Sequence, residues 1–306
     1  MSEIPIAVGD VEAQKRFLAS HQAFLREYHE LDTLLKKVFL RAFVTFTQEH
    51  QVAKVGEKLS PEEQIKADDL MMAVPVVFSL GRIAADDFGE LLTLAGNGRG
   101  IGAYKILRGM YERVVTAAFI AKNPAEARPF LIHSHIQRWK LWKRTVEIKP
   151  EIEKRVPPDE IQELEREYSE ARKQMKAEIC KTCGQPNTQE AWTRTNLDTM
   201  ATHTDPSLAV AYAYCYLLPT FHAHATAFGM ESRFTHTDKG YSYKELSEEE
   251  AHSAVMNAHG LILRLFKQQN SYFNLGLDAE IDARWNMFPQ IWGNKDGNAD
   301  SLQQGS

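Results

Sequence analysis

The chain has 306 residues, three cysteines and a formal net charge of −5, with 43% hydrophobic and 25% charged residues. Three cysteines exclude a disulfide-stapled scaffold and suit a reducing compartment, so we expect a soluble globular protein in the cytoplasm. The negative charge argues against bulk electrostatic capture of nucleic acid or of an anionic membrane, and only a local basic patch would bind either.

The first half of the chain has a helical period. Apolar residues recur at steps of three and four over residues 10–54, which predicts one long amphipathic helix. The sequence Ser60-Pro61-Glu62-Glu63 combines an N-cap, a proline in the first turn and a glutamate three residues after the cap. A second helix therefore begins at residue 60 and runs toward Leu94, with a kink near Pro75.

A charged helical hairpin is predicted in the middle of the chain. Glycines over residues 96–102 predict a loop before a helix over 101–122, and Asn123-Pro124 marks the start of the next helix. The segment 159–179 is polar on most faces, so it should project from the molecule or pair with one neighbour. We expect residues 137–180 to form this hairpin, through which copies of the chain could form a homo-oligomer.

Residues 206–230 contain no Lys, Arg, Asp or Glu. The stretch is long enough to span a bilayer, but it holds a proline and two histidines, whose polar groups find partners more readily inside a protein than in lipid. We therefore interpret it as a buried core helix and predict no membrane contact. A polar loop over 231–245 should follow it.

The remaining segments complete an all-α fold. Helices are predicted near residues 188–203, 248–270 and 278–288, and no segment alternates convincingly as a strand. Residues 291–306 are rich in polar residues and glycine, which indicates a disordered tail. The prediction is one bundle of eight to ten helices over residues 1–290, with the charged hairpin as an appendage.

The first candidate site lies on the helix over 101–122. Arg108 and Glu112 are four residues apart, so they share a helix face beside a broad apolar surface. This places them near a buried seam. Two interpretations stay open: an ion pair that fixes the register of the bundle, or a functional pair.

The second candidate site lies in the charge-free segment. Tyr216, Thr220 and His224 are spaced by four residues, so their polar tips should follow one stripe. His222 lies roughly 200° around the helix from His224 and cannot face the same site unless Pro219 distorts the helix. A hydrogen-bonded core histidine is the alternative for either histidine.

These two segments resemble an uncharacterised family of bacterial all-helical proteins, known as a domain of unknown function. The family pattern has an Arg-x-x-x-Glu helix, an Asn-Pro helix start and a later Tyr-x-x-x-Ser-x-x-x-His helix. The matching residues are Arg108, Glu112, Asn123, Pro124, Tyr216, Thr220 and His224. The family is similar to HEPN-like helical domains of abortive-infection proteins, some of which are ribonucleases with an Arg-x(4–6)-His motif. No clean copy of that motif occurs here, so the resemblance implies fold more than function.

Two further motifs have a structural and a functional interpretation. Cys180 and Cys183 form a C-x-x-C pair, which is half of a zinc site, but two more ligands would be needed and two ordinary thiols are the simpler interpretation. No cofactor is therefore expected, with zinc as the alternative. The basic aromatic stretch over 135–144 could bind RNA by phosphate contact and stacking, or could pack its tryptophans inward.

Two functions follow from these patterns. In the first, a polar core pocket lined by the Arg108 and His224 segments acts on, or senses, nucleic acid or a nucleotide in a defence or stress role. Arg108 would hold an anion and His224 would act as acid or base, oriented by Glu112 or Tyr216. In the second, the same residues form a buried structural network in a non-catalytic interaction protein. Convergence of Arg108 and His224 beside an open cavity would favour the first.

Overall fold

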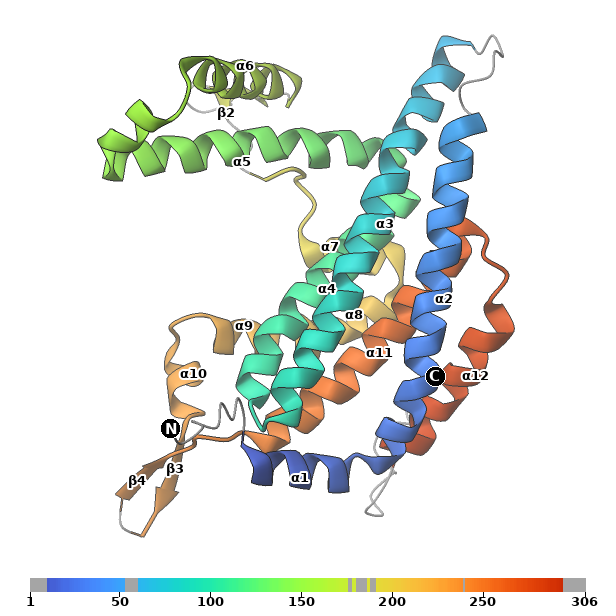
Figure 1. Cartoon of the computed structure of the whole chain (residues 1–306), viewed down its shortest axis with the longest axis vertical. Coiled ribbons are helices and arrows are strands. Elements are labelled where there is room, and N and C mark those ends of the chain that lie inside the picture. The colour runs from blue at the N-terminus through green and yellow to red at the C-terminus, as the bar shows by residue number, and fades with distance from the viewer. Residues whose placement is uncertain are drawn as a thin grey trace, which may run out of the picture.

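The protein is all-α apart from two short antiparallel hairpins in the part of the chain that the structure, a computed structural model, describes (Figure 1). The described residues are 10–52, 60–175, 178–179, 186–187, 191–238 and 240–293. They form twelve α-helices, more than the eight to ten expected, because two predicted helices are broken into shorter ones. Within these ranges, none of the helices combines the length and the apolarity that a membrane crossing requires.

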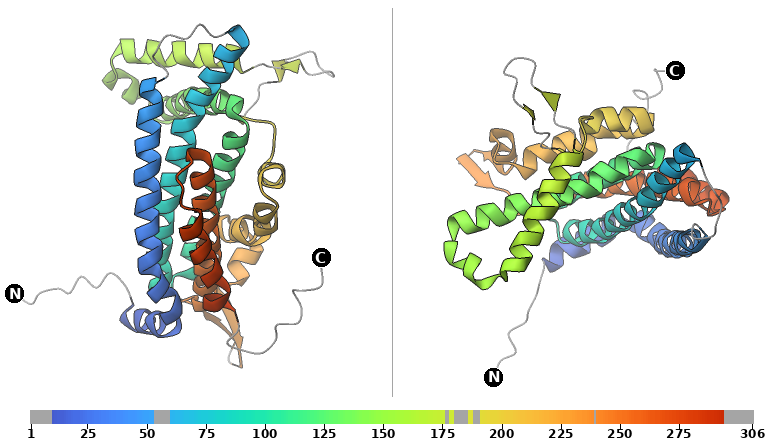
Figure 2. Two further views of the ribbon diagram at one scale, coloured as in Figure 1. Left: turned by 90° about the vertical axis from the view of Figure 1, so that its right-hand side faces the viewer. Right: turned by 90° about the horizontal axis from the view of Figure 1, so that it is seen from above.

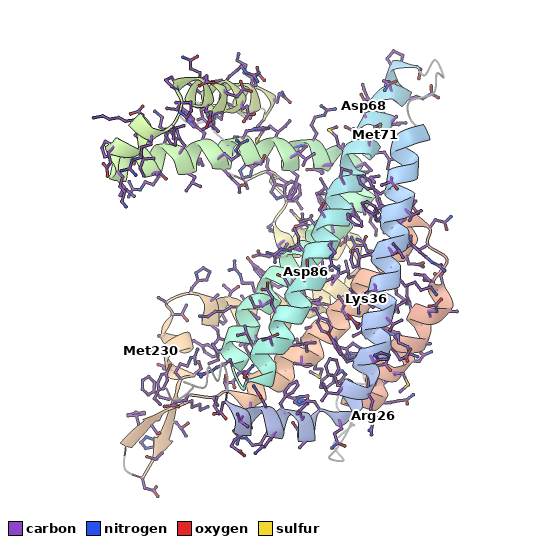
Figure 3. The ribbon with its side chains drawn as sticks, in the orientation of Figure 1. Arg26, Lys36, Asp68, Met71, Asp86 and Met230 are labelled. Atoms are coloured by element: carbon purple, nitrogen blue, oxygen red, sulfur yellow. The ribbon has the colours of Figure 1, made fainter. Side chains whose placement is uncertain are left out.

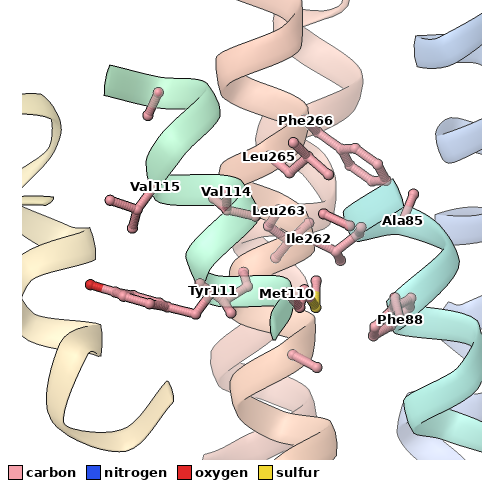
Figure 4. Packing of buried hydrophobic residues seen from close by; sticks show 14 of the residues in the cluster. Ala85, Phe88, Met110, Tyr111, Val114, Val115, Ile262, Leu263, Leu265 and Phe266 are labelled. Atoms are coloured by element: carbon pink, nitrogen blue, oxygen red, sulfur yellow. The ribbon is translucent and has the colours of Figure 1, made fainter. Parts of the chain in front are cut away.

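Three long helices form the centre of the molecule: α3 (Pro61–Gly96), α4 (Gly100–Lys122) and α11 (Glu248–Phe273). Ser60 and Glu63 form the predicted capping box at the start of α3, and the helix continues through Pro75. Figure 4 shows side chains of all three helices meeting in one layer, where close packing excludes water.

The first turns of α4 and α11 touch through their backbones. A Cβ atom on Gly100 would lie 2.2 Å from the backbone nitrogen of Ala251 and 2.2 Å from the carbonyl oxygen of Ser247. The hydroxyl of Ser247, the residue before α11, makes no hydrogen bond to its own helix and instead accepts one from the Ile101 amide of α4 (3.0 Å). Only a residue without a side chain permits this approach, so Gly100 fixes how the two helices cross.

Three helices cover one side and one end of this core. Helix α2 (Gln22–Val52) and α12 (Asp278–Trp292) lie along the side, and α1 (Val11–Ser20) crosses the end (Figure 1). The single helix predicted over residues 10–54 is wrong at His21, whose backbone is not helical (φ −113°, ψ 23°). Its ring stacks on Phe17 and contacts α11, so tertiary contacts override the continuous apolar period there.

Helices α5 (Ala127–Ile148) and α6 (Pro158–Gln174) form an arm that projects from the bundle (Figures 1 and 2). A single 3₁₀ turn, η1 (Pro124–Glu126), leads into the arm, and another, η2 (Pro150–Arg155), joins its two helices. The arm corresponds to the charged hairpin predicted over 137–180, although it begins earlier.

Charged and aromatic side chains of α5 contact side chains of α6. Glu167 accepts from both His135 (2.9 Å) and Arg138 (3.2 Å), and Trp139 stacks on Tyr168 at 5.5 Å between centroids. The basic aromatic stretch therefore packs Trp139 against α6, as its structural interpretation predicts.

The charge-free segment is not one helix. It comprises α8 (Pro206–Tyr212), a π turn η3 (Ala213–Leu217), α9 (Leu218–Ala223) and α10 (Ala227–Glu231). Pro219 has no amide hydrogen to donate one turn back, and the wider π turn just before it accommodates the ring. The helix then stops at His224. The preceding α7 (Leu197–Thr204) is also shorter than the helix predicted over 188–203.

Residues predicted as a polar loop over 231–245 instead contain a hairpin. Strand β3 (Phe234–Thr237) pairs antiparallel with β4 (Gly240–Tyr243), so Phe234 faces Tyr243 and His236 faces Tyr241. Each strand has only four residues, too few for a clear alternating pattern. A second hairpin pairs β1 (Glu178–Ile179) with β2 (Pro186–Asn187).

The disorder predicted for residues 291–306 falls mostly on residues 294–306, outside the described ranges. Helix α12 itself extends to Trp292, slightly past the predicted boundary.

A pair of glycine substitutions tests the backbone contact. Gly100→Ala should lower the free energy of unfolding by about 3 kcal/mol, because backbone atoms cannot move aside as a flexible side chain would. Gly89→Ala is the matched control, since nothing lies within 4 Å of its added Cβ. It should stabilise α3 by roughly 0.5–1 kcal/mol through helix propensity. Urea unfolding measures both, and equal effects would contradict the assignment.

Candidate functional site

The structure brings together three of the five predicted site residues. Arg108 pairs with Glu112 (Nη2–Oε1 3.0 Å), and the Arg108 guanidinium lies 5.2 Å from the centre of the Tyr216 ring. The side chains of Arg108 and Glu112 are 26% and 41% exposed, so the pair lies at the surface of α4 rather than in a buried seam. This cluster stabilises the contact between α4 and η3, and such a half-exposed ion pair contributes little by itself.

Thr220 and His224 do not join this cluster. The Thr220 hydroxyl donates to the carbonyl oxygen of Tyr216 one turn back (2.6 Å). His224 is exposed, and its extended backbone ends α9 (φ −101°, ψ 163°), so the predicted stripe ends at Thr220. Within the described ranges His224 makes no ion pair or side-chain hydrogen bond with Arg108 or Glu112. A catalytic role for these residues stays a prediction.

His222 is the buried histidine of this segment. Its ring stacks on Tyr104 at 5.5 Å and meets the edge of Phe228 at 5.5 Å. Burial is the main cause that lowers the pKa of His222, with Arg233 adding to the effect and Glu250 opposing it. These contacts fit the alternative interpretation, a core histidine that stays neutral.

The metal hypothesis at Cys180 and Cys183 falls outside the described residues and stays a prediction. Among the described residues, no group of three or more His, Cys, Asp or Glu side chains could hold a metal ion. Cys215 is buried in η3, and desolvation raises the pKa of its thiol to about 12. Such a thiol is unreactive at neutral pH.

One cavity, of about 380 Å³, lies at the end of the bundle between α1, the end of α3 and the start of α11. His21 and His252 line it, and their rings touch through Nε2 and Nδ1 at 3.1 Å. Sequence reasoning missed this pair. The available signal was the Glu249-x-x-His252 spacing, which places both side chains on one face of α11 toward the cavity.

His259 lies deeper in the same helix. It is fully buried, and its Nδ1 accepts a hydrogen bond from the Trp292 indole (2.9 Å). Burial lowers the pKa of His259 to about 4, so the ring is neutral at physiological pH. This contact anchors the last turn of α12 to α11.

A second cavity, also of about 380 Å³, lies between α4, the α7–α8 turn and α11. Three basic side chains line it, Lys122, Arg264 and Lys267, against the single carboxylate of Asp205. We call it the cationic cavity. Its remaining polar lining includes Gln268, whose Nε2 is buried without a hydrogen-bond partner among the described residues.

Arg264 is the distinctive residue of the cationic cavity. Its guanidinium donates to the Ser207 hydroxyl (2.9 Å) and to the Gly260 carbonyl (2.8 Å), both neutral acceptors. Within the described part of the chain, no carboxylate forms an ion pair with it, and Asp205 acts only at longer range. Burial is the main cause that lowers the pKa of Arg264. A half-buried cation without a counter-ion is costly, and an anion bound in the cavity would offset that cost.

The other two cations of the cavity have at most a weak acidic partner among the described residues, although Lys267 also lies 5.4 Å from the centre of the Trp285 ring. Lys122 donates to the Thr204 carbonyl and has no acidic partner among the described residues. Lys267 lies 3.5 Å from Asp282, but both side chains are more than half exposed (54% and 59%), so this pair is weak. The sequence did not reveal this grouping, because the three residues come from two helices far apart in the chain.

The chain belongs to DUF5677, a family of unknown function, which matches residues 76–242, more than half of its length. This confirms the resemblance to an uncharacterised domain family. The matched range begins within α3 and ends in β4, so it includes α4 to α10 but leaves out α11. No curated protein and no solved structure matches the chain. The similarity to HEPN-like domains stays a prediction.

The buried histidine predicts an acid-sensitive stability. An unfolded chain binds a proton at His259 near pH 6.5, whereas the folded protein binds it only near pH 4. Stability is therefore complete above pH 6.5 and falls as the pH drops toward 4, by about 3 kcal/mol in total. His259→Gln keeps an acceptor for Trp292 and should remove this part of the pH dependence. The exposed His203→Gln should not, and identical profiles for the two variants would contradict the assignment.

Proposed function

We propose that the protein binds a phosphate-bearing small molecule of the nucleotide class in the cationic cavity. The observation that carries this proposal is the half-buried Arg264 guanidinium, which faces the cavity without a carboxylate partner among the described residues. Lys122 and Lys267 add two positive charges to the same walls. Basic residues gathered around one concavity favour multiply charged anions.

The size and the walls of the cavity support a nucleotide rather than a bare phosphate ion. A volume of about 380 Å³ falls within the usual range for small-molecule pockets. One wall is apolar and aromatic, with Val114, Ala118, Leu208 and Tyr272. A nucleobase could pack on this wall while its phosphates reach the basic groups.

The proposal keeps the predicted binding of an anion but places it in the cationic cavity instead of at Arg108. Arg108 was predicted to hold the anion, yet it already pairs with the Glu112 carboxylate. Arg264 also lies over an aromatic ring, that of Trp285 at 5.2 Å, but it has no carboxylate partner among the described residues. The Arg108 cluster thus favours the second predicted role, a structural network. The predicted role in phage defence or stress is part of this proposal, because a nucleotide-binding helical protein could act in either. Any action on RNA is likewise part of the proposal.

Isothermal titration with ATP, GTP, their monophosphates and inorganic phosphate tests the proposal. At least one nucleotide should bind more tightly than inorganic phosphate. Arg264→Leu should weaken that nucleotide by about 100-fold, because a charge-assisted contact to phosphate contributes about 1.5–3 kcal/mol. Lys122→Gln, an exposed position that folding tolerates, should weaken it by about tenfold.

Arg144→Leu is the matched control, because Arg144 is 72% exposed on the arm and pairs only with Glu147. It should bind as the unchanged protein does. Circular dichroism of each variant separates lost binding from lost folding. Absence of binding by every nucleotide, or equal binding by the Lys122→Gln variant and the control, would overturn the proposal.

A further inference from the structure

The charge-free segment presents an apolar face to solvent. Its exposed residues from α8 to α9 are all apolar: Pro206, Val210, Ala213, Tyr214, Leu217 and Phe221. Val210 is 74% exposed and Tyr214 is 61% exposed. We call these six residues the outer face. Monomeric proteins rarely expose a continuous apolar strip of this kind, so the outer face marks a contact with something else.

The opposite side of the same segment is mostly apolar. Leu208, Cys215 and Pro219 are buried toward the core of the bundle, together with the polar His222. A segment with apolar side chains on both sides is typically covered on both sides. The prediction of a buried core helix over 206–230 was therefore correct for one side of the helix and wrong for the other in the isolated chain.

We propose that a second copy of this chain covers the outer face, helix against helix, in a homodimer. Val210, Tyr214, Leu217 and Phe221 follow one another at steps of four, three and four residues. This alternation is the spacing of a helix–helix seam, in which side chains of one helix fit between those of another. The expected occupant is therefore another helix.

The absence of charge favours a second copy as that helix. In a two-fold interface the same patch of both copies meets, and a residue near the axis meets its own copy, so a charge there would be repelled. Residues 206–230 contain no charged side chain, and the outer face can meet itself without repulsion. Helices that lie on membranes instead carry Lys and Arg on their polar side, and the chain as a whole has a net charge of −5.

The size of the face is adequate for a dimer. The Phe221 ring contacts Phe228 at 5.5 Å, which extends the apolar surface onto α10. There Met230 is 60% exposed, on the side of the molecule away from Lys36 of α2 (Figure 3). Six large side chains are about half exposed on this enlarged surface, and together they present on the order of 600 Å² of accessible area. They are Val210, Tyr214, Leu217, Phe221, Phe228 and Met230. Smaller neighbours add to this, and a standard interface buries about 800 Å² per partner.

The charged arm is a weaker candidate for the homo-oligomer contact predicted through residues 137–180. Its His135 and Arg138 already pair with Glu167, and Trp139 stacks on Tyr168. The outer face, by contrast, keeps Val210 and Tyr214 more than 60% exposed. The dimer does not rest on nucleotide binding, although Pro206 lines the cationic cavity and also begins the outer face, so the partner would lie at the rim of that cavity.

Charge placed at the centre of the face tests the proposal. Sedimentation equilibrium should show a dimer for the unchanged protein at micromolar concentration. Tyr214→Glu and Tyr214→Lys should each weaken the dimer by about 100-fold, because like charges would meet across the two-fold axis. Tyr214 is exposed, so neither substitution should disturb the fold. An equimolar mixture of the two variants should restore the dimer, which a merely misfolded protein would not do.

Leu141→Glu is the matched control, since Leu141 is 70% exposed on the arm, and it should leave the dimer intact. Arg264→Leu should also dimerise normally, which separates this proposal from nucleotide binding. A monomer at all concentrations would overturn the proposal, as would dissociation by Leu141→Glu alone. Binding of the unchanged monomer to neutral phosphatidylcholine vesicles, abolished by Tyr214→Glu, would assign the face to lipid instead.

Discussion

The backbone contact between the first turns of α4 and α11 is the constraint on which the rest of the structure depends. Gly100 lets the two helices approach to atomic contact, and Ser247 shares its hydroxyl with α4 rather than with its own helix. Helices α3, α7 and α9 pack against α4, and α2, α3 and α12 pack against α11. The family match covers α4 but not α11, so the matched residues 76–242 supply only part of one hydrophobic core. The folding unit is therefore larger than the family region.

Local signals in the sequence were sufficient where neighbouring residues alone determine the backbone conformation. The capping box at Ser60 and the helix over 101–122 are both present, because their determinants lie within a few residues. Tertiary contacts decided the conformation elsewhere. His21 breaks a continuous apolar period, and its ring contacts both Phe17 and the distant His252 of α11. A partner as far away in the sequence as His252 leaves no trace in a local pattern. At Asn123 two local interactions compete, and the side chain closes α4 through the Phe119 carbonyl instead of capping the next helix.

The candidate site shows the same division. The contact between Arg108 and Glu112 follows from their spacing, and Tyr216 joins them as the resemblance suggested. Arg264 could not be identified, because its lack of a carboxylate partner depends on where α7 and α8 lie against α11. The absence of charge over residues 206–230 was likewise ambiguous in the sequence alone. It indicated burial, whereas the structure divides the charge-free segment into a covered side and an uncovered side, a distinction that needs the neighbours of each residue.

The indole of Trp292 provides a built-in probe of the C-terminal helix. Its hydrogen-bonded proton points at the fully buried imidazole of His259, and the ring also contacts His252 of α11 and His21 at the junction of α1 and α2. That proton exchanges with deuterium only when the last turn of α12 detaches, so its exchange rate reports the free energy of a local opening. Because side-chain indole protons resonate apart from most backbone amides, one magnetic-resonance signal would follow the attachment of α12 while the bundle core stays folded.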